Sequence, residues 1–276
     1  MISVWGSLKR WDVTQQGLYS DNTPFVKVPW LEEAADMAEG ITIKASSITE
    51  LFSGLALATT INDMNFFARP IRTLVLPYIP GARQDRYNIK GDVLSSLSMV
   101  AELINSLKFD RVIVADPHSP AAYIYINNLV EYPLENIYER LWKGYTGVIA
   151  PDKGARMRAA TAGNTLDLHL FQGGKVRDVS NGRLTGFEVE PLEAGGHYIV
   201  IDDICDGGGT FVGLGYKIAE QGAYADLFVT HGIFAKGTKD LKSYYKNIYT
   251  TDTHEFHSAN EVMKFNVVED MENYNG

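Results

Sequence analysis

HYIVIDDICDGGGTF, residues His197 to Phe211, carries the strongest structural signal in the sequence. Its first half is a short apolar run, which is typical of a strand buried on both faces of a parallel sheet. Asp202 and Asp203 follow at the end of that run, and three glycines then lead into a helical pattern. Ligands of open α/β sheets bind at the carboxyl ends of the strands, so we expect the acids and the glycines at a binding site.

The glycine turn has the features of an anion-binding loop. Glycine lets the backbone approach a ligand closely, and N–H groups at the start of a helix are donors for a phosphate. Asp202 and Asp203 would then accept hydrogen bonds from vicinal sugar hydroxyls. The pattern lacks the ending of a P-loop, the glycine spacing of a dinucleotide fold and the acid spacing of a calcium loop. It therefore predicts a ribose phosphate site whose phosphate donors are Gly207, Gly208, Gly209 and Thr210.

Short apolar runs alternate with helical patterns along the rest of the chain, which predicts mostly parallel sheets covered by helices. Helices are expected over 47–66, where Ser47 and Glu50 form a capping box, and over 92–107 and 210–222. The expected strands are Ile41–Ala45, Thr73–Tyr78, Arg111–Asp116, Gly147–Asp152, Tyr198–Asp203 and Asp226–Gly232.

Residues Phe171 to Pro191 interrupt this alternation, because they contain four glycines and few apolar side chains. We predict a mobile loop or a hairpin that carries the basic residues Lys175, Arg177 and Arg183. A segment of this kind is typical of lids that close over reacting groups.

Length and polarity indicate two domains. A chain of 276 residues fits one large domain or two moderate ones. The polar segment Glu131 to Asn136 separates two comparable α/β halves, so we predict domains over 1–131 and 132–276.

The charge balance and the cysteine count exclude several classes of protein. The chain has 25 basic and 34 acidic side chains, and the net charge of −9 opposes non-specific nucleic-acid binding. A phosphate ligand must therefore be held locally. The single cysteine, Cys205, excludes a disulfide framework. No signal peptide or long apolar run is present, so we expect a cytoplasmic protein without a membrane partner.

The acidic and glycine-rich segment resembles the ribose-phosphate loop of ribose-phosphate pyrophosphokinases and of the related type I phosphoribosyltransferases. Further segments resemble elements of the pyrophosphokinases alone, in that family's order, and the resemblance covers roughly Ile41 to Asp252. These segments are LPYIPGARQDR (76–86), ADPHS (115–119), IAPDKGARMRA (149–159) and VTHGIF (229–234).

The resemblance implies an α/β fold of two tandem doubly wound domains, like those of phosphoribosyltransferases, each a mostly parallel sheet flanked by helices. It also implies a reaction, in which the β,γ-pyrophosphoryl group of ATP moves to the anomeric hydroxyl of ribose 5-phosphate with release of AMP. Magnesium would be the cofactor, and the enzyme would be a homo-oligomer. Catalysis would rest on positioning and on charge neutralisation.

The same resemblance assigns roles to individual residues. Lys175 and Arg177 match the family's Lys-x-Arg pair on the catalytic loop, and His118 would join them as a catalytic residue. ATP would be bound by Arg83, Gln84, Asp85, Arg86 and His118. The metal would be held by Asp116, His118 and Asp152. The ribose phosphate would be held by Asp202, Asp203, Asp206, Gly207, Gly208, Gly209 and Thr210.

Two features depart from the family. The family's Phe-x-Asp-Gly-Glu element, which reaches the adenine pocket of a neighbouring subunit, is replaced by PFVKVPW at Pro24 to Trp30. The family's Asp-Thr-Gly-Gly-Thr loop has a glycine, Gly207, in place of its first threonine, which removes a hydroxyl and a side chain beside the 5-phosphate. A more open pocket would accept a substituted ribose 5-phosphate such as ADP-ribose.

Two other functions stay open from the sequence. A type I phosphoribosyltransferase acting in nucleotide or NAD salvage would share the acidic and glycine-rich loop, but it has no need of the other motifs. A non-catalytic regulatory paralogue would be expected to lose catalytic residues, whereas Lys175, Arg177 and His118 are present. Arg83 and Arg86 also have an ordinary alternative as surface ion-pair partners.

Overall fold

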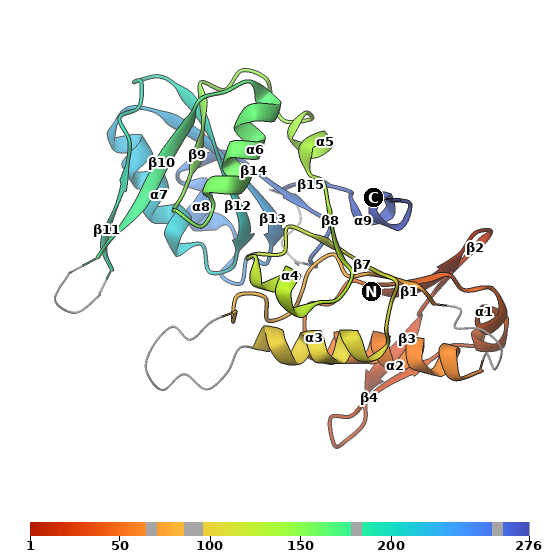
Figure 1. Cartoon of the computed structure of the whole chain (residues 1–276). Coiled ribbons are helices and arrows are strands. Elements are labelled where there is room, and N and C mark those ends of the chain that lie inside the picture. The colour runs from red at the N-terminus through yellow and green to blue at the C-terminus, as the bar shows by residue number, and fades with distance from the viewer. Residues whose placement is uncertain (65–70, 86–95, 178–183, 256–261, 276) are drawn as a thin grey trace. The chain divides into compact units, whose positions relative to one another are not determined.

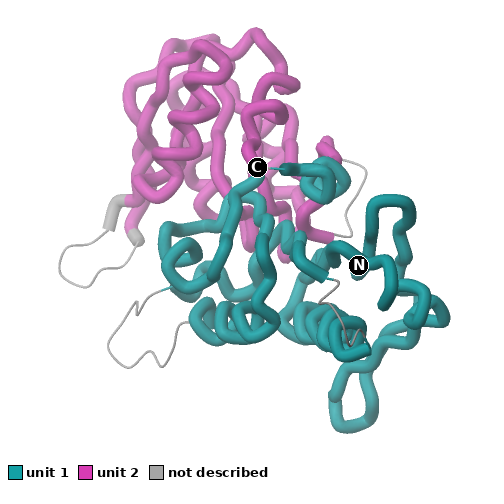
Figure 2. The backbone as a smooth tube through the Cα atoms, turned by 45° about the vertical axis from the view of Figure 1, so that its right-hand side comes forward, with its two compact units in different colours: residues 1–132, 267–276 teal, residues 133–266 magenta. Residues whose placement is uncertain are grey.

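The computed structural model describes residues 1–64, 71–85, 96–177, 184–255 and 262–275. The chain divides into two compact units, which Figure 2 shows in different colours. Unit 1 comprises residues 1–132 together with 267–276, and unit 2 comprises residues 133–266.

Unit 1 is built on a six-stranded sheet with the order β2-β1-β5-β6-β7-β8. The strands from β5 to β8 run parallel, while β1 pairs antiparallel with both β2 and β5. A separate hairpin is formed by β3 and β4 (Figure 1). The strands are β1 (Ile2–Gly6), β2 (Lys9–Asp12), β3 (Gln15–Leu18), β4 (Pro24–Lys27), β5 (Gly40–Ile43), β6 (Thr73–Val75), β7 (Arg111–Ala115) and β8 (Leu129–Tyr132). The helices are α1 (Leu31–Met37), α2 (Ile48–Met64), α3 (Ser96–Ser106), α4 (Ala121–Tyr125) and α9 (Val268–Glu272).

Unit 2 contains a seven-stranded sheet with the order β11-β10-β9-β12-β13-β14-β15. It is parallel except for β11, which forms an antiparallel hairpin with β10. The strands are β9 (Gly147–Ala150), β10 (Leu170–Arg177), β11 (Leu184–Val189), β12 (His197–Cys205), β13 (Tyr224–Gly232), β14 (Tyr245–Thr251) and β15 (Met263–Phe265). The helices are α5 (Glu135–Tyr138), α6 (Arg156–Leu166), α7 (Gly209–Glu220) and α8 (Lys239–Lys242).

All six expected strands are present, because their apolar runs are buried on both faces of the parallel sheets. Ile199, Val200 and Ile201 in β12 are fully buried. The expected α/β class, with mostly parallel sheets flanked by helices, is therefore confirmed. Residues 171–191 form the β10–β11 hairpin, whose tip, including Arg183, lies outside the described residues.

The helix signals at the start of α2 and the end of α7 are also confirmed. The Ser47 hydroxyl accepts the Glu50 N–H at 3.2 Å, and the Glu50 carboxylate accepts the N–H of Ser46. Gly222 follows α7 with φ +72°, a conformation that glycine adopts without steric cost. The start expected at residue 92 lies outside the described residues, and α3 is described from Ser96 onward.

The C-terminal residues pack with the first sheet. The expected second domain, 132–276, included residues 267–276, whereas these residues belong to unit 1. Glu272 accepts a hydrogen bond from the Thr42 hydroxyl at 2.6 Å and forms an ion pair with Arg10. The Arg111 guanidinium donates to the Tyr274 carbonyl at 2.8 Å. Within the described part of the chain, no helix is long and apolar enough to span a bilayer.

Candidate active site

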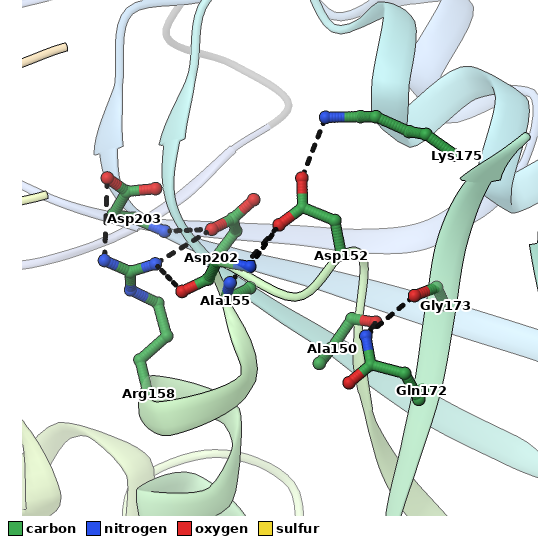
Figure 3. A network of polar contacts seen from close by, with 10 residues as sticks. Ala150, Asp152, Ala155, Arg158, Gln172, Gly173, Lys175, Asp202 and Asp203 are labelled. Carbon is green, nitrogen blue, oxygen red and sulfur yellow. Dashed lines mark hydrogen bonds and ion pairs between the residues drawn. The ribbon is translucent and has the colours of Figure 1, made fainter. Parts of the chain in front are cut away.

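Two acidic side chains and an arginine meet near the carboxyl end of β12 (Figure 3). The Arg158 guanidinium, on the first turn of α6, places Nη1 3.4 Å from Oδ1 of Asp202. Its Nη2 lies 3.7 Å from Oδ2 of Asp203. Arg158 also donates to the Gly154 carbonyl at 3.3 Å, which anchors the guanidinium to the turn before its own helix.

The surroundings of Asp202 shift the pKa of its carboxyl group. Burial, followed by the neighbouring Asp203 carboxylate, raises the pKa of Asp202 well above its ordinary value, while the charge of Arg158 lowers it. A buried group with a perturbed pKa at the end of a parallel strand is typical of a ligand site.

The glycine turn connects β12 to α7. Gly208 has φ +75°, a left-handed conformation that other residues adopt only with strain. The first helical bond runs from the Val212 N–H to the Gly208 carbonyl at 3.0 Å. The N–H groups from Gly207 to Thr210 precede that bond, so no helical carbonyl accepts from them. The binding of a phosphate by these N–H groups stays a prediction. The Asp206 carbonyl accepts the Ala235 N–H at 3.0 Å, which ties the turn to the segment after β13.

Asp152 and Lys175 meet across the turn after β9. The Lys175 ammonium lies 2.8 Å from Oδ2 of Asp152, and Oδ1 accepts the N–H groups of Gly154 and Ala155 at 2.9 and 3.3 Å (Figure 3). Burial raises the pKa of Asp152, but Lys175 and the two N–H groups outweigh it and hold that pKa below its ordinary value. Both side chains line a hollow of about 820 Å³ together with the hairpin residues Gly173, Gly174 and Glu188.

Unit 1 places Asp116 and His118 directly after β7, in a strained turn. Both residues have positive φ, +38° and +58°, and the His118 N–H donates to the Asp116 carbonyl at 2.8 Å. Asp116 is buried. Non-glycine residues in this conformation cost energy and cluster at functional sites. The strain supports the prediction that this turn binds a ligand.

The remaining nucleotide candidates lie in the turn over 80–85 of unit 1. Gly81 has φ +82°, and the Gln84 N–H donates to its carbonyl at 2.9 Å. The exposed side chains of Arg83 and Gln84 follow, and Gln84 accepts a hydrogen bond from the Ser96 hydroxyl. Asp85 is half-buried, and Arg86 lies outside the described residues.

Arg158 was missed by the sequence analysis, although it lies within the quoted segment 149–159. The arginine two residues earlier donates instead to Gln172 at 3.1 Å, and spacing alone does not say which of the two faces β12. Arg177 ends β10, and its side chain lies outside the described part of the chain. The described residues contain no group of three His, Cys, Asp or Glu side chains that could hold a metal ion by themselves.

The fold and this site define a class of protein. It is an α/β protein whose paired acids and glycine turn lie near the carboxyl end of a parallel strand, where proteins with open α/β sheets bind their ligands. No protein-family model matches the chain.

Comparisons with curated proteins narrow the class. The chain is 29% identical to the "Ribose-phosphate pyrophosphokinase" of Pyrococcus abyssi over 231 residues, which covers 79% of this chain and 75% of that protein. It is 31% identical to the protein of the same name from Hyphomonas neptunium over 194 residues, covering 66% of this chain and 61% of that protein. A third protein of this name, from Cereibacter sphaeroides, is 30% identical over 196 residues, 66% of this chain and 56% of that protein.

A solved structure has the same fold. It is the phosphoribosylpyrophosphate synthetase from Mycobacterium smegmatis, with a TM-score of 0.77 and 19% identity, covering 94% of this chain and 87% of that one. The chain belongs to the ribose-phosphate pyrophosphokinase family. It spans less than two thirds of the length of the second and third relatives.

Proposed function

We propose that this chain is an ATP-dependent ribose-phosphate pyrophosphokinase. The anomeric oxygen of ribose 5-phosphate attacks the β-phosphorus of ATP, the bond from that phosphorus to the oxygen bridging the α-phosphate breaks, and AMP leaves. The hydroxyl proton passes to solvent. The observation that carries the proposal is the pairing of Lys175 with Asp152 beside a glycine-lined hollow, because a phosphoribosyltransferase needs no such lysine.

Lys175 is the first catalytic candidate. Its ammonium lies on the hairpin strand β10 and lines the hollow, where a cation would neutralise charge that develops on the transferring phosphates. Arg177, two residues further along β10, would add a second positive charge. Release of Lys175 from Asp152 would accompany the approach of the triphosphate.

The donor set in unit 1 fits a magnesium nucleotide. Magnesium takes oxygen ligands and is commonly held by one or two carboxylates together with substrate phosphates. Asp116 supplies a carboxylate in the strained turn, and His118 supplies a ring donor for a phosphate. Arg83 and Gln84, with Asp85 and Arg86, would bind the nucleotide. Asp152, in unit 2, would help to hold a second metal or the pyrophosphate.

The ribose phosphate would occupy the end of β12. Asp202 and Asp203 would accept from the sugar hydroxyls, Asp206 would lie beside them, and the N–H groups from Gly207 to Thr210 would bind the 5-phosphate. A larger acceptor such as ADP-ribose stays a candidate, because Gly207 has no side chain where the family has a threonine, and a Cβ atom at Gly207 would meet the flexible Lys236 side chain at 3.6 Å. The oligomeric state and the cytoplasmic location stay predictions.

The test is to incubate the protein with magnesium, ATP and either ribose 5-phosphate or ADP-ribose, following AMP release and the phosphorus spectrum of the product. A pyrophosphorylated sugar phosphate supports the proposal. If neither acceptor gives such a product, the proposed pyrophosphokinase activity is wrong. If ribose 5-phosphate alone gives a product, the proposal that ADP-ribose is an acceptor is wrong. Lys175→Ala should lower kcat by about 100-fold to 1000-fold while changing ATP binding far less. Lys217→Ala, which removes an exposed ion pair on α7, is the matched control.

A further inference from the structure

We propose that Arg158 is a positioning residue that holds Asp202 and Asp203 in the orientation in which they accept the sugar hydroxyls. This inference rests on the proposed function, because those hydroxyls belong to its acceptor. The guanidinium reaches both carboxylates, at 3.4 and 3.7 Å, through different nitrogens (Figure 3). One planar group therefore fixes two side chains that leave the strand at successive positions.

The three side chains are largely buried, which strengthens both the repulsion between the two carboxylates and their attraction to Arg158. The exposed fractions of the side chains are 14% for Arg158, 13% for Asp202 and 6% for Asp203. In such surroundings two adjacent carboxylates cannot both stay ionised without a nearby cation. A protonated acid accepts fewer hydrogen bonds and donates its proton to the neighbouring carboxylate. Removal of the arginine would therefore change both the net charge of the two acids and the orientation of their carboxyl groups.

The position of the guanidinium is itself fixed. Arg158 donates to the Gly154 carbonyl, and the N–H of Gly154 donates to Asp152, so the turn after β9 links the acid pair to the Lys175 contact. Oδ1 of Asp202 also accepts the N–H of Asp203 at 2.9 Å, which restricts the rotation of that carboxylate. Arg158 thus acts through the two acids, which makes it a positioning residue.

Other ionisable groups also lie near the pair, on the elements packed against it. Cys205 and Asp206 follow on the same chain segment, and burial, followed by the charges of Asp202 and Asp206, raises the pKa of the Cys205 thiol. On the neighbouring strand β13, His231 is paired in register with Ile204, and its Nδ1 lies 2.8 Å from the Thr253 hydroxyl. These groups are present in both the wild type and the Arg158 variants, so they contribute equally to the pH profiles that are compared below.

The test uses Arg158→Gln and Arg158→Lys in the full chain, with Arg140→Gln as the control, since Arg140 lies over the ring of Phe265 and has no assigned role. Arg158→Gln should lower kcat/KM for ribose 5-phosphate at least 50-fold while KM for magnesium-ATP changes less than 3-fold. It should also move the acidic limb of the pH profile to higher pH. Arg158→Lys should restore part of the loss, because it keeps the charge. Equal effects on both substrates, or an unmoved acidic limb, would overturn the inference.

A second measurement needs no turnover. With 13C-labelled aspartate carboxyls, assigned through Asp202→Asn and Asp203→Asn, the pair should titrate at higher pH in Arg158→Gln than in the wild type. If the wild type makes no product but this titration moves as expected, the proposed function fails and the pairing stands. If the carboxyl titration is the same in both proteins, the pairing role is wrong. A variant that is less stable with an unmoved titration indicates a merely structural arginine.

Discussion

Asp226 offers a sharp test of how unit 2 holds the strand that carries the acid pair. Its carboxylate is fully buried at the start of β13 and accepts four hydrogen bonds, two at each oxygen. Oδ2 accepts from the Tyr145 hydroxyl at 2.6 Å and from the Asn247 side chain at 3.0 Å. Oδ1 accepts the Asn247 N–H at 3.0 Å and lies 3.1 Å from Nε2 of His197, the first residue of β12.

Asp226→Asn keeps the shape of the side chain but cannot keep these bonds. An amide has one oxygen, so whichever way it turns, its NH₂ group faces two donors. The Tyr145 hydroxyl can rotate to accept, but Asn247 keeps a bond only if its side-chain amide turns over, and a buried amide left unpaired costs about 1–3 kcal/mol. The remaining bonds also lose their charge assistance, which makes such bonds about twice as strong. We expect a total loss of about 3 kcal/mol in the free energy of unfolding.

Urea unfolding measures this loss, and Trp142 is a suitable reporter. Its ring lies 4.8 Å from His197 and 5.0 Å from Tyr145, centroid to centroid. With a slope of about 1–3 kcal/mol per molar urea, the midpoint should fall by about 1–3 M. Tyr145→Phe, which removes one donor, should cost about 1–2 kcal/mol and calibrates the series. A midpoint for Asp226→Asn within about 0.3 M of the wild type would refute the reasoning.

Three further outcomes follow from the geometry. Gly208→Ala should destabilise the chain by about 1–2 kcal/mol because of its φ of +75°, whereas Gly209→Ala should stay within about 0.5 kcal/mol, and thermal unfolding compares them. His118→Gly should relieve a φ of +58°, so its unfolding free energy should not fall, although AMP release should drop at least about 100-fold. Lys175→Met should raise the pKa of Asp152, so the protein should begin to unfold at a higher pH during acid titration.

The sign of the acid effect follows from linkage. The pKa of Asp152 is lowered in the folded state, so its contribution to stability is present above the unfolded value of about 3.9 and is lost as the pH falls through the folded value. An acid transition of Lys175→Met at or below that of the wild type would contradict the ion pair. An equal loss of stability in Gly208→Ala and Gly209→Ala would contradict the strained turn, and an active His118→Gly would remove that histidine from the nucleotide site.

The sequence predicts the strands, helices and turns that are determined by residues close together in the chain. The β12 strand and the glycine turn after it follow from a fully apolar run and from a conformation that glycine adopts without strain. The prediction fails where the cause is a contact between distant segments. Glu272 joins Arg10 across 262 positions of sequence, and no local pattern indicates that pairing. Arg158 is a similar case, because two arginines share one helical turn and the fold decides which of them meets the acids.

Two acidic sites on neighbouring strands differ in how their surroundings stabilise a carboxylate. At the start of β13, four donors surround the single carboxylate of Asp226, and this arrangement stabilises the folded state without any ligand. Near the end of β12, burial and then the neighbouring charge of Asp203 raise the pKa of Asp202, and Arg158 opposes that effect. Repulsion between two adjacent carboxylates destabilises the folded state, so such a pair is more typical of a functional site than of a structural one. Sugar hydroxyls would supply donors to these carboxylates, so the binding of ribose 5-phosphate should stabilise unit 2 by offsetting that repulsion.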